Sequence, residues 1–310
     1  MKDNILTEIP DILPNHYIGK VRDTFDLRDG RMVFVTSDRL SAFDRAITAV
    51  PDKGAILNGI ARFWFERTAD ILPNHVISYP DPNVMIVRKL AMLPVEVVVR
   101  RYMTGTTGTS IWTKYKNGER TMYGHIFPEG MVKNQELPET IITPTTKGKS
   151  DDPISGADIV ATGLVSKDLW EKTETAALAL FKRGQEIAAK QGLILVDTKY
   201  EFGTDENGNL TIADEIHTPD SSRYWIADTY AERFAKGEDP DGLDKEFVRK
   251  WLVDRMKDAY KDPIPQITDA DNNMFSRKYA ELYERMTGGK FLSFGSKVPI
   301  MERIQKNLKF

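Results

Sequence analysis

The stretch Leu193–Ile216, LILVDTKYEFGTDENGNLTIADEI, decides the fold of this chain. Two apolar runs flank Asn207-Gly208, and an Asn-Gly pair between such runs is the strongest short-range signal of a β-hairpin. A two-residue type I′ turn at this point would fix the register of the two strands. In that register Glu201 directly faces Asp214.

One face of this hairpin carries several charged residues. Because side chains alternate between the two faces of a strand, Asp197 and Lys199 share the face of Glu201. Opposed like charges are unfavourable in a sheet, so Glu201 and Asp214 favour a cation between them. Two carboxylates, with water and phosphate completing the shell, commonly hold Mg²⁺ at nucleotide sites. The alternative is a solvated face, although the wholly apolar run Leu193–Val196 is typical of a buried strand that ends at a cleft.

The rest of the pattern predicts an α+β protein with two antiparallel sheets and a helical C-terminal segment. Strands are expected at Tyr17–Leu27, Met32–Thr36, Val84–Lys89, Val95–Arg101 and Leu210–Ile216, and helices at Gly54–Ile71, Ser166–Gln191, Ser222–Ala235, Asp244–Tyr260 and Asp269–Met286. From Gly105 to Gly156 little periodicity is visible, which predicts long functional loops. An N-terminal lobe, residues 1–100, and a larger lobe, residues 101–310, are expected, with their boundary near residues 90–110.

Composition excludes several functions. Lys plus Arg number 43 and Asp plus Glu 46, a net charge of −3, so no broad basic field exists for nucleic acid or anionic lipid. The absence of cysteine excludes thiol catalysis, iron–sulfur clusters and disulfides, and the four histidines lack metal-ligand spacing. No apolar run approaches the ~18 residues of a membrane span, and charges interrupt residues 1–13, unlike a secretory signal. We expect a cytoplasmic protein.

The segment Gly19-Lys20-Val21-Arg22 is a candidate phosphate-binding element. Glycine lets backbone N–H groups approach phosphate oxygens, and the alternation puts Lys20 and Arg22 on one side of a strand. It is not a P-loop, since G-x-x-x-x-G-K-[ST] is absent from the chain. A solvated basic edge strand is the alternative interpretation.

Two hydroxyl-rich loops carry similar chemistry. Arg100-Arg101 ends a valine-rich strand and leads into Thr104–Ser110, where guanidinium groups beside small hydroxyl residues favour an anion. The alternative is a mobile surface loop with an ordinary ion pair. Thr143–Ser150 repeats this composition.

Arg223 is a further candidate cation. It follows Thr218–Ser222, which contains three residues suited to cap the helix expected at Ser222–Ala235. A cation in the first turn of a helix opposes the helix dipole. We therefore expect an anionic ligand near Arg223.

Five separated stretches resemble the SAICAR synthetase family, the phosphoribosylaminoimidazole-succinocarboxamide synthases of purine biosynthesis. The likeness runs from about residue 15 to residue 255 in the family's order. The stretches are Gly19–Asp23, Ser37–Asp44, Val97–Arg100, Leu193–Gly203, and Asp214-Glu215 with Thr218–Arg223.

The resemblance implies a fold and a reaction. The fold would be SAICAR synthase-like, with a nucleotide site between two sheets, related to the kinase and ATP-grasp folds. The enzyme would be an ADP-forming carbon–nitrogen ligase that joins L-aspartate to carboxyaminoimidazole ribotide through an acyl phosphate, with ATP and Mg²⁺ as cofactors. Its partners would be these small molecules, with no nucleic acid or membrane.

The resemblance also implies roles for individual residues. The ATP phosphates would lie under Gly19, Lys20 and Arg22, the adenine would be bordered by Lys89, Met92 and Glu96, Mg²⁺ would be held by Glu201 and Asp214, and Lys199 would neutralise phosphate charge. The ribotide would be bound by Arg100, Thr106 and Arg223. The imidazole carboxylate or the aspartate would lie near Lys147, Asp152 and Ser155. Asp152 and Asp197 both stay candidates for the base that accepts the amine proton.

Two other functions would use the same hairpin. A kinase-like phosphotransferase would transfer phosphate to another small molecule and would turn over without an amine. A non-catalytic nucleotide sensor would bind ATP and change its affinity for a partner. Monomer and homo-oligomer both stay open, because a dimer interface and a packed helical tail leave similar apolar stripes.

Overall fold

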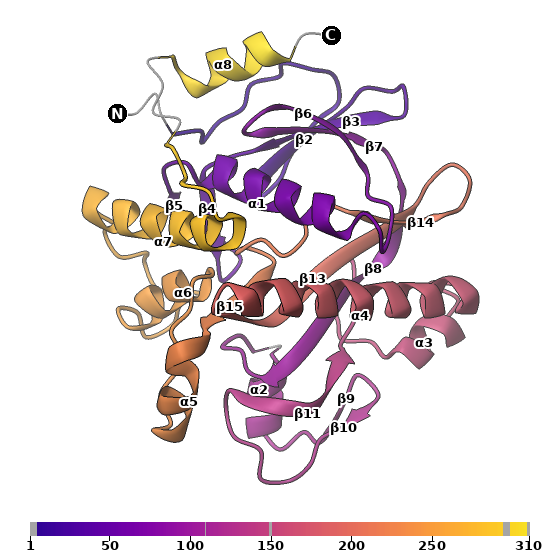
Figure 1. Cartoon of the computed structure of the whole chain (residues 1–310), viewed down its shortest axis with the longest axis vertical. Coiled ribbons are helices and arrows are strands. Elements are labelled where there is room, and N and C mark those ends of the chain that lie inside the picture. The colour runs from indigo at the N-terminus through magenta and orange to yellow at the C-terminus, as the bar shows by residue number, and fades with distance from the viewer. Residues whose placement is uncertain (1–4, 109, 149–150, 294–297, 309–310) are drawn as a thin grey trace.

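Two antiparallel sheets form the frame of the molecule (Figure 1). The computed structural model describes residues 5–108, 110–148, 151–293 and 298–308. The first sheet has the spatial order β1 (His16–Ile18), β2 (Arg22–Asp26), β3 (Arg31–Thr36), β7 (Val84–Arg88) and β6 (Val76–Asp81). The second has the order β11 (Gln135–Ile142), β8 (Ala91–Met103), β13 (Leu193–Thr204) and β14 (Leu210–Ala213), with β12 (Thr145–Thr146) on β8 and β15 (Ser222–Ile226) on β13.

The remaining elements are two small strand pairs and the helices. The strand pairs are β4 (Arg39–Ala42) with β5 (Arg45–Ala49), and β9 (Thr121–Met122) with β10 (His125–Ile126). The helices in the described ranges are α1 (Lys53–Thr68), α2 (Ile111–Lys116), α3 (Gly156–Ala161), α4 (Lys167–Lys190), α5 (Ala227–Ala235), α6 (Glu246–Val253), α7 (Asp269–Thr287) and α8 (Ile300–Asn307).

Strand β13 is the centre of the second sheet. It pairs with β8 along one edge, while its first half pairs with β15 and its second half with β14 on the other. Its apolar residues, among them Leu195, Tyr200 and Phe202, are buried in the main core. The strand thus has partners on both sides over most of its length, as its continuous apolar start predicts.

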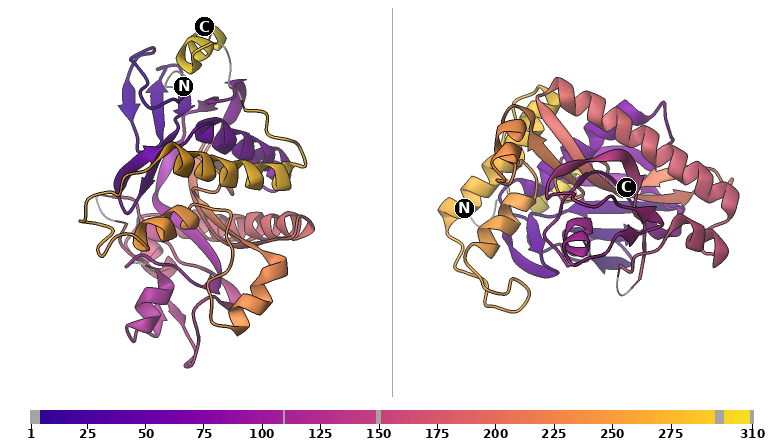
Figure 2. Two further views of the ribbon diagram at one scale, coloured as in Figure 1. Left: turned by 90° about the vertical axis from the view of Figure 1, so that its left-hand side faces the viewer. Right: turned by 90° about the horizontal axis from the view of Figure 1, so that it is seen from below.

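Three helices complete the main core, and a fourth covers the first sheet. Helix α4 packs along β13, and α1 packs side by side with α7 between the two sheets (Figures 1 and 2). Helix α7 turns an apolar stripe inward, consisting of Phe275, Tyr279, Leu282 and Met286. Helix α8 covers the first sheet, where Ile300 and Ile304 join the small core around Phe25.

The predicted hairpin register is wrong by one residue. Glu201 pairs with Ala213, not with Asp214. The strands are joined by a five-residue loop, because the carboxylate of Asp205 accepts the N–H groups of Asn207 at 2.9 Å and Asn209 at 2.8 Å. Such a side-chain turn competes with the two-residue turn that Asn-Gly favours.

Two other elements differ from the prediction. The region 105–156 contains α2 and the eight-residue strand β11, which pairs with β8. Residues Ser222–Ile226 form strand β15 and not the first turn of a helix, so the helix-dipole argument for Arg223 is wrong. The aromatic pair Tyr224-Trp225 explains the difference, since large aromatic residues favour strands.

The division at residue 100 falls inside β8, which runs continuously from Ala91 to Met103. The first sheet consists of strands from residues 16–88 and the second of strands from residues 91–226. Helices α7 and α8 return to the N-terminal elements. The two-lobe division stays a prediction.

A tight helix–loop contact provides a test of the packing. In α4, a Cβ added at Gly184 would lie 2.4 Å from the His217 ring and 2.6 Å from Leu195. We expect Gly184→Ala to lower the free energy of unfolding by about 1–3 kcal/mol, because overpacking forces buried side chains to move. Thermal unfolding followed by circular dichroism measures the loss. Lys182→Ala, at an exposed position of the same helix, is the control, and an equal effect of both variants would contradict this packing.

Candidate active site

A cluster of alternating charges lies on the face of β13 that carries Glu201. Lys199 donates to Glu201 Oε1 at 2.9 Å and to Glu96 Oε1 at 2.7 Å, and Glu96 is the residue of β8 paired with Glu201. Lys147 contacts the other carboxylate oxygen of Glu201. Its backbone N–H is fixed by the Pro94 carbonyl at 2.9 Å. The predicted neighbours Glu201, Lys199 and Lys147 are therefore brought together.

The electrostatics of this cluster keep its lysine charged. Burial alone would lower the pKa of Lys199, but the carboxylates of Glu201 and Glu96 raise it overall. Burial also raises the pKa of Glu96, and the ammonium group of Lys199 only partly offsets this. A phosphate entering the cluster would therefore meet an ammonium group and not a neutral amine.

Asp214 lies in the same cluster, but not as the predicted strand partner of Glu201. It follows β14 with a left-handed φ of 59°, a conformation that Asp adopts more readily than most residues. Its carboxylate contacts Arg22, whose other terminal nitrogen lies 3.7 Å from Glu215. Arg22 also interacts electrostatically with Glu201. One buried guanidinium thus lies among the two carboxylates predicted to hold Mg²⁺ and the neighbouring Glu215.

Arg22 and its neighbours control the charge of Asp214. Burial would raise the pKa of this carboxyl, but Arg22, Lys199 and Lys147 together lower it. Asp214 is therefore ionised at neutral pH. Within the described residues no group of three or more His, Cys, Asp or Glu side chains could hold a metal ion, so any metal here would rest on two carboxylates.

A second charged cluster lies four positions earlier on β13. Asp197 pairs with Arg100 of β8 on one side and with Arg223 of β15 on the other. Arg100 Nη1 lies 3.2 Å from Asp197 Oδ2, and Arg223 contacts the same oxygen. Two guanidinium groups therefore share one carboxylate, which leaves positive charge over for a ligand.

Glu246 is a second carboxylate beside these arginines, and it contacts both Arg223 and Thr106. Arg223 Nε lies 3.5 Å from Glu246 Oε2, and Thr106 donates to Glu246 Oε1 at 2.7 Å. Burial lowers the pKa of Arg100, while for Arg223 the nearby carboxylates outweigh burial and raise it. Thr106 thus lies at this cluster, next to Arg223.

Arg100, Asp197 and Arg223 line a cavity of about 160 Å³. Its walls come from β8, β13, the loop before β15, β15 itself and α6 with the two residues before it. The charged and hydroxyl residues that line it are Arg100, Asp197, Thr198, Lys199, Asp220, Ser221, Ser222, Arg223, Asp244, Lys245 and Arg249. Five cations against three carboxylates make the cavity attractive to an anion.

Lys245 and Arg249 were not predicted from the sequence. They lie four residues apart, at the start of α6 and inside it, and so on one face of that helix. Their spacing in the predicted helix 244–260 was a signal that could have identified them. Asp244 before them accepts the N–H groups of Tyr224 at 2.8 Å and Glu246 at 2.7 Å, which fixes α6 against β15.

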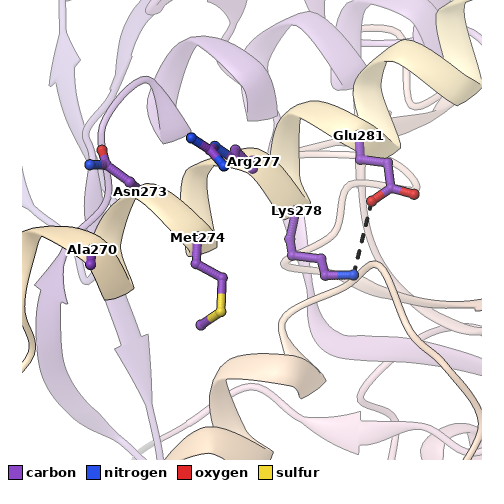
Figure 3. Close-up of a pocket in the computed structure, with 6 residues that line it drawn as sticks. All are labelled: Ala270, Asn273, Met274, Arg277, Lys278 and Glu281. Carbon is purple, nitrogen blue, oxygen red and sulfur yellow. Dashed lines mark ion pairs between the residues drawn. The ribbon is translucent and has the colours of Figure 1, made fainter.

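A larger groove of about 450 Å³ lies elsewhere, along the outer face of α7 (Figure 3). Its lining residues, among them Met274 and Arg277, come from that helix alone and are exposed or half-buried. Lys278 and Glu281 form its ion pair at 3.9 Å. The smaller cavity is the better candidate, since its charged groups converge from several elements.

Several predicted residues lie away from these clusters. Lys20 pairs with Asp44 at 2.6 Å on the exposed surface, and Lys89 pairs with Asp26 at 2.6 Å. Ser155 accepts the N–H of Asp158 at 3.0 Å and caps α3.

Three others lie at the edges of the site. A Cβ on Gly19 would lie 2.3 Å from the Arg22 carbonyl, so this glycine permits a tight turn. Met92 lies exposed beside Gly203, and Asp152 is exposed with its carbonyl bonded to Thr146 N–H. Thr109, Lys149 and Ser150, in the two predicted anion loops, lie outside the described residues.

Comparisons with known proteins identify the family of this chain. The family model for SAICAR synthetase matches residues 15–267. A relative from Agrobacterium fabrum, a putative phosphoribosylaminoimidazole-succinocarboxamide synthase 2, is 55% identical over 96% of this chain and 95% of its own. The solved SAICAR synthase from Saccharomyces cerevisiae complexed with SAICAR has a TM-score of 0.79 and 33% identity, covering 92% of this chain and 98% of its own. A SAICAR synthetase solved in complex with ADP has a TM-score of 0.69 and 28% identity, covering 90% of this chain and 100% of its own.

The fold and the matched sequences define a carbon–nitrogen ligase of purine biosynthesis that forms ADP. The chain belongs to the SAICAR synthetase family, and its activity is that of a phosphoribosylaminoimidazole-succinocarboxamide synthase. The predicted family, fold class and reaction are confirmed. No helix in the described part of the chain is long and apolar enough to cross a membrane.

The shared carboxylate of Asp197 provides a stability test. We expect Asp197→Asn to lower the free energy of unfolding by about 3–5 kcal/mol, because it removes the carboxylate that Arg100 pairs with and leaves Arg223 with Glu246 alone. Inorganic phosphate should restore part of this loss, so the melting temperature of the variant should rise more with phosphate than that of the parent. Asp26→Asn, at an exposed ion pair, is the control and should change stability by about 1 kcal/mol or less. Equal phosphate shifts in variant and parent would contradict an anion site at this position.

Proposed function

We propose that the Arg100–Arg223 cavity binds carboxyaminoimidazole ribotide and that the neighbouring Glu201 cluster binds the ATP phosphates. The observation that carries this proposal is the alternation along β13. Asp197, Lys199 and Glu201 share one face, so a ribotide phosphate at one end and a nucleotide at the other would be only a few residues apart. A carboxylate held between them would lie close to the γ-phosphoryl group.

The chemistry requires activation of this carboxylate. A carboxylate oxygen attacks the γ-phosphorus, the bond to the β-phosphate oxygen breaks, and ADP leaves with an acyl phosphate remaining. The amine of L-aspartate then attacks the acyl carbon, inorganic phosphate leaves, and the nitrogen gives up a proton as the amide forms. Phosphoryl transfer of this kind depends mainly on positioning and on compensation of charge.

Three cations of the Glu201 cluster suit the triphosphate. Lys199, Lys147 and Arg22 are held by carboxylates that a nucleotide's phosphates can replace as partners. Glu201 and Asp214 would hold Mg²⁺, and two carboxylates with open positions for water and phosphate are a donor set that this ion prefers. Bound there, Mg²⁺ would neutralise charge on the phosphate oxygens. The contact of Asp214 with Arg22 and the electrostatic interaction of Arg22 with Glu201 support this proposal.

The phosphate of the ribotide would bind to the positive charge of the cavity that its carboxylates do not neutralise. Arg100 and Arg223, which line the cavity, would bind its phosphate, and Thr106 would act beside them through its bond to Glu246. Lys245 and Arg249 add two charges from the other wall. Arginine suits this task, because its planar donors match phosphate oxygens in pairs.

The remaining predicted roles are proposals as well. Met92 is exposed and offers an apolar contact to the adenine. Gly203 has no side chain and so lets Met92 lie close to the backbone of β13. Lys89, Glu96, Gly19 and Lys20 would border the nucleotide, and Ser155 would act at the aspartate end. Asp197 already holds two guanidinium groups, so we favour Asp152 as the base for the amine proton. We also propose a cytoplasmic location, which the cysteine-free composition supports.

The proposed metal ligand can be tested by substitution. We expect Glu201→Gln to lower kcat more than about a hundredfold, since even outer-shell partners of metal ligands cost about 10–100-fold. The Mg²⁺ concentration needed for half-maximal ADP formation should rise as well. A coupled ADP assay over a Mg²⁺ series measures both quantities.

Glu206→Gln, in the loop of the same hairpin, is the matched control, because Glu206 is exposed. Its kcat should equal that of the parent. A Glu201→Gln variant with the parent's kcat and Mg²⁺ dependence would exclude the proposed metal site.

The proposed order of bond formation predicts a requirement for the amine. ADP release should depend on ATP, the carboxylated ribotide, Mg²⁺ and L-aspartate together. Omission of aspartate should limit ADP to about one equivalent per enzyme at most, because an enzyme-bound acyl phosphate has no acceptor. Continuous turnover without any amine would indicate simple phosphotransfer and would contradict the proposed sequence.

A further inference from the structure

Asp220 is a buried residue in the wall of the cavity, and its carboxylate binds side chains from three other parts of the chain. Its Oδ2 accepts from Lys53 of α1 at 2.8 Å and from Lys245, just before α6, at 3.4 Å. Its Oδ1 accepts from the hydroxyl of Tyr279, on α7, at 2.9 Å. The Asp220 side chain is 4% exposed and that of Lys53 is fully buried. The carboxylate therefore depends on these protein donors in place of water.

The charge of Asp220 is maintained by its cations. Burial would raise the pKa of this carboxyl, but Lys245 and Lys53 lower it overall. A buried carboxylate has a large desolvation cost unless it is paired and hydrogen-bonded. Loss of any donor should therefore allow the carboxylate and the loop that carries it to move.

The loop that carries Asp220 also carries the ligand-facing groups. Together with the first two residues of β15 it forms the segment that we name loop 218–223, from Thr218 to Arg223. This segment lines the cavity with Ser221, Ser222 and Arg223. Backbone bonds tie it to the site: Lys199 N–H donates to Ser221 O at 2.9 Å, and Lys245 N–H donates to Pro219 O at 3.1 Å. A shift of Asp220 would therefore displace cations on both walls of the cavity.

Tyr279 contributes to this site from a remote part of the chain. Helix α7 begins at Asp269, after the end of the matched family range at residue 267. Its outer face is the exposed groove of Figure 3, and its inner face packs on α1 and carries the buried Tyr279. The Tyr279 ring also packs against Phe247 of α6 and lies 5.6 Å from Lys53 Nζ.

We propose that Tyr279 is a positioning residue that sets the affinity for the ribotide by holding Asp220, and through it Lys245 and the loop 218–223. It does not touch the ligand itself. This inference rests on the proposed binding of the ribotide in the cavity, and it adds the C-terminal helix to the determinants of that binding.

The test is Tyr279→Phe, which removes the hydroxyl and keeps the ring in the core. We expect KM for the ribotide to rise about tenfold, the equivalent of about 1.4 kcal/mol. KM for ATP should stay within about twofold, because among the described residues no side chain of the Glu201 cluster bonds to the Asp220 carboxylate, and Lys199 meets the loop only through its backbone N–H. The dissociation constant for the ribotide, measured by calorimetry below the melting temperature, should weaken by the same factor as KM.

Tyr283→Phe is the matched control, since Tyr283 lies one turn further along α7 and packs against Phe291. It should leave both KM values unchanged. A Tyr279→Phe variant that melts at a lower temperature with unchanged ribotide affinity would show a purely structural role and overturn the proposal. An equal rise of both KM values would overturn it as well.

A third variant separates this proposal from the proposed function. Arg223→Gln should raise KM for the ribotide whether or not Tyr279 acts through Asp220. If Arg223→Gln has this effect and Tyr279→Phe does not, the positioning role alone fails. If Arg223→Gln leaves the ribotide affinity unchanged, the assignment of the cavity fails and the positioning role fails with it.

Discussion

The site depends on the ion pairs of one carboxylate, that of Asp197, with guanidinium groups from both neighbouring strands. In the sheet, Arg100 and Arg223 would repel each other without it. Arg100 would keep only the hydroxyl of Thr143 as a partner, and Arg223 only the carboxylate of Glu246. Asp197 and Glu246 are two carboxylates for three arginines, Arg100, Arg223 and Arg249, so the cluster is paired and still keeps positive charge. This incomplete compensation would favour a small anion in a protein whose net charge is negative.

Strand β13 carries both charged clusters, that of Asp197 and that of Glu201, on one face because its side chains alternate. Asp197, Lys199 and Glu201 line one face, while residues between them, such as Tyr200, enter the core. The charged face is held by strands on both sides, which limits its movement. The spacing between the Asp197 cluster and the Glu201 cluster therefore follows from the rise of an extended backbone and needs no flexible loop.

Sequence patterns predicted most of this arrangement, and the errors have local causes. Alternation correctly put Lys199 and Glu201 on one face, and the apolar start of the strand correctly indicated its burial. The turn was wrong because Asp205 binds two backbone N–H groups and widens the loop. The pair Lys53–Asp220 could not be predicted, since its members are 167 residues apart and each resembles an ordinary surface residue of its segment. Contacts of this kind depend on tertiary packing, which has no periodic signal.

The return of the C-terminal segment to the first sheet has a consequence for synthesis of the chain. Arg303 of α8 bonds to Asp81 at 2.9 and 3.1 Å, and Ile300 and Ile304 close the small core around Phe25. On the ribosome, the N-terminal sheet emerges early but lacks this cover until α8 has left the exit tunnel. Between these two events the nascent chain exposes the apolar surface around Phe25, which chaperones would have to protect from aggregation.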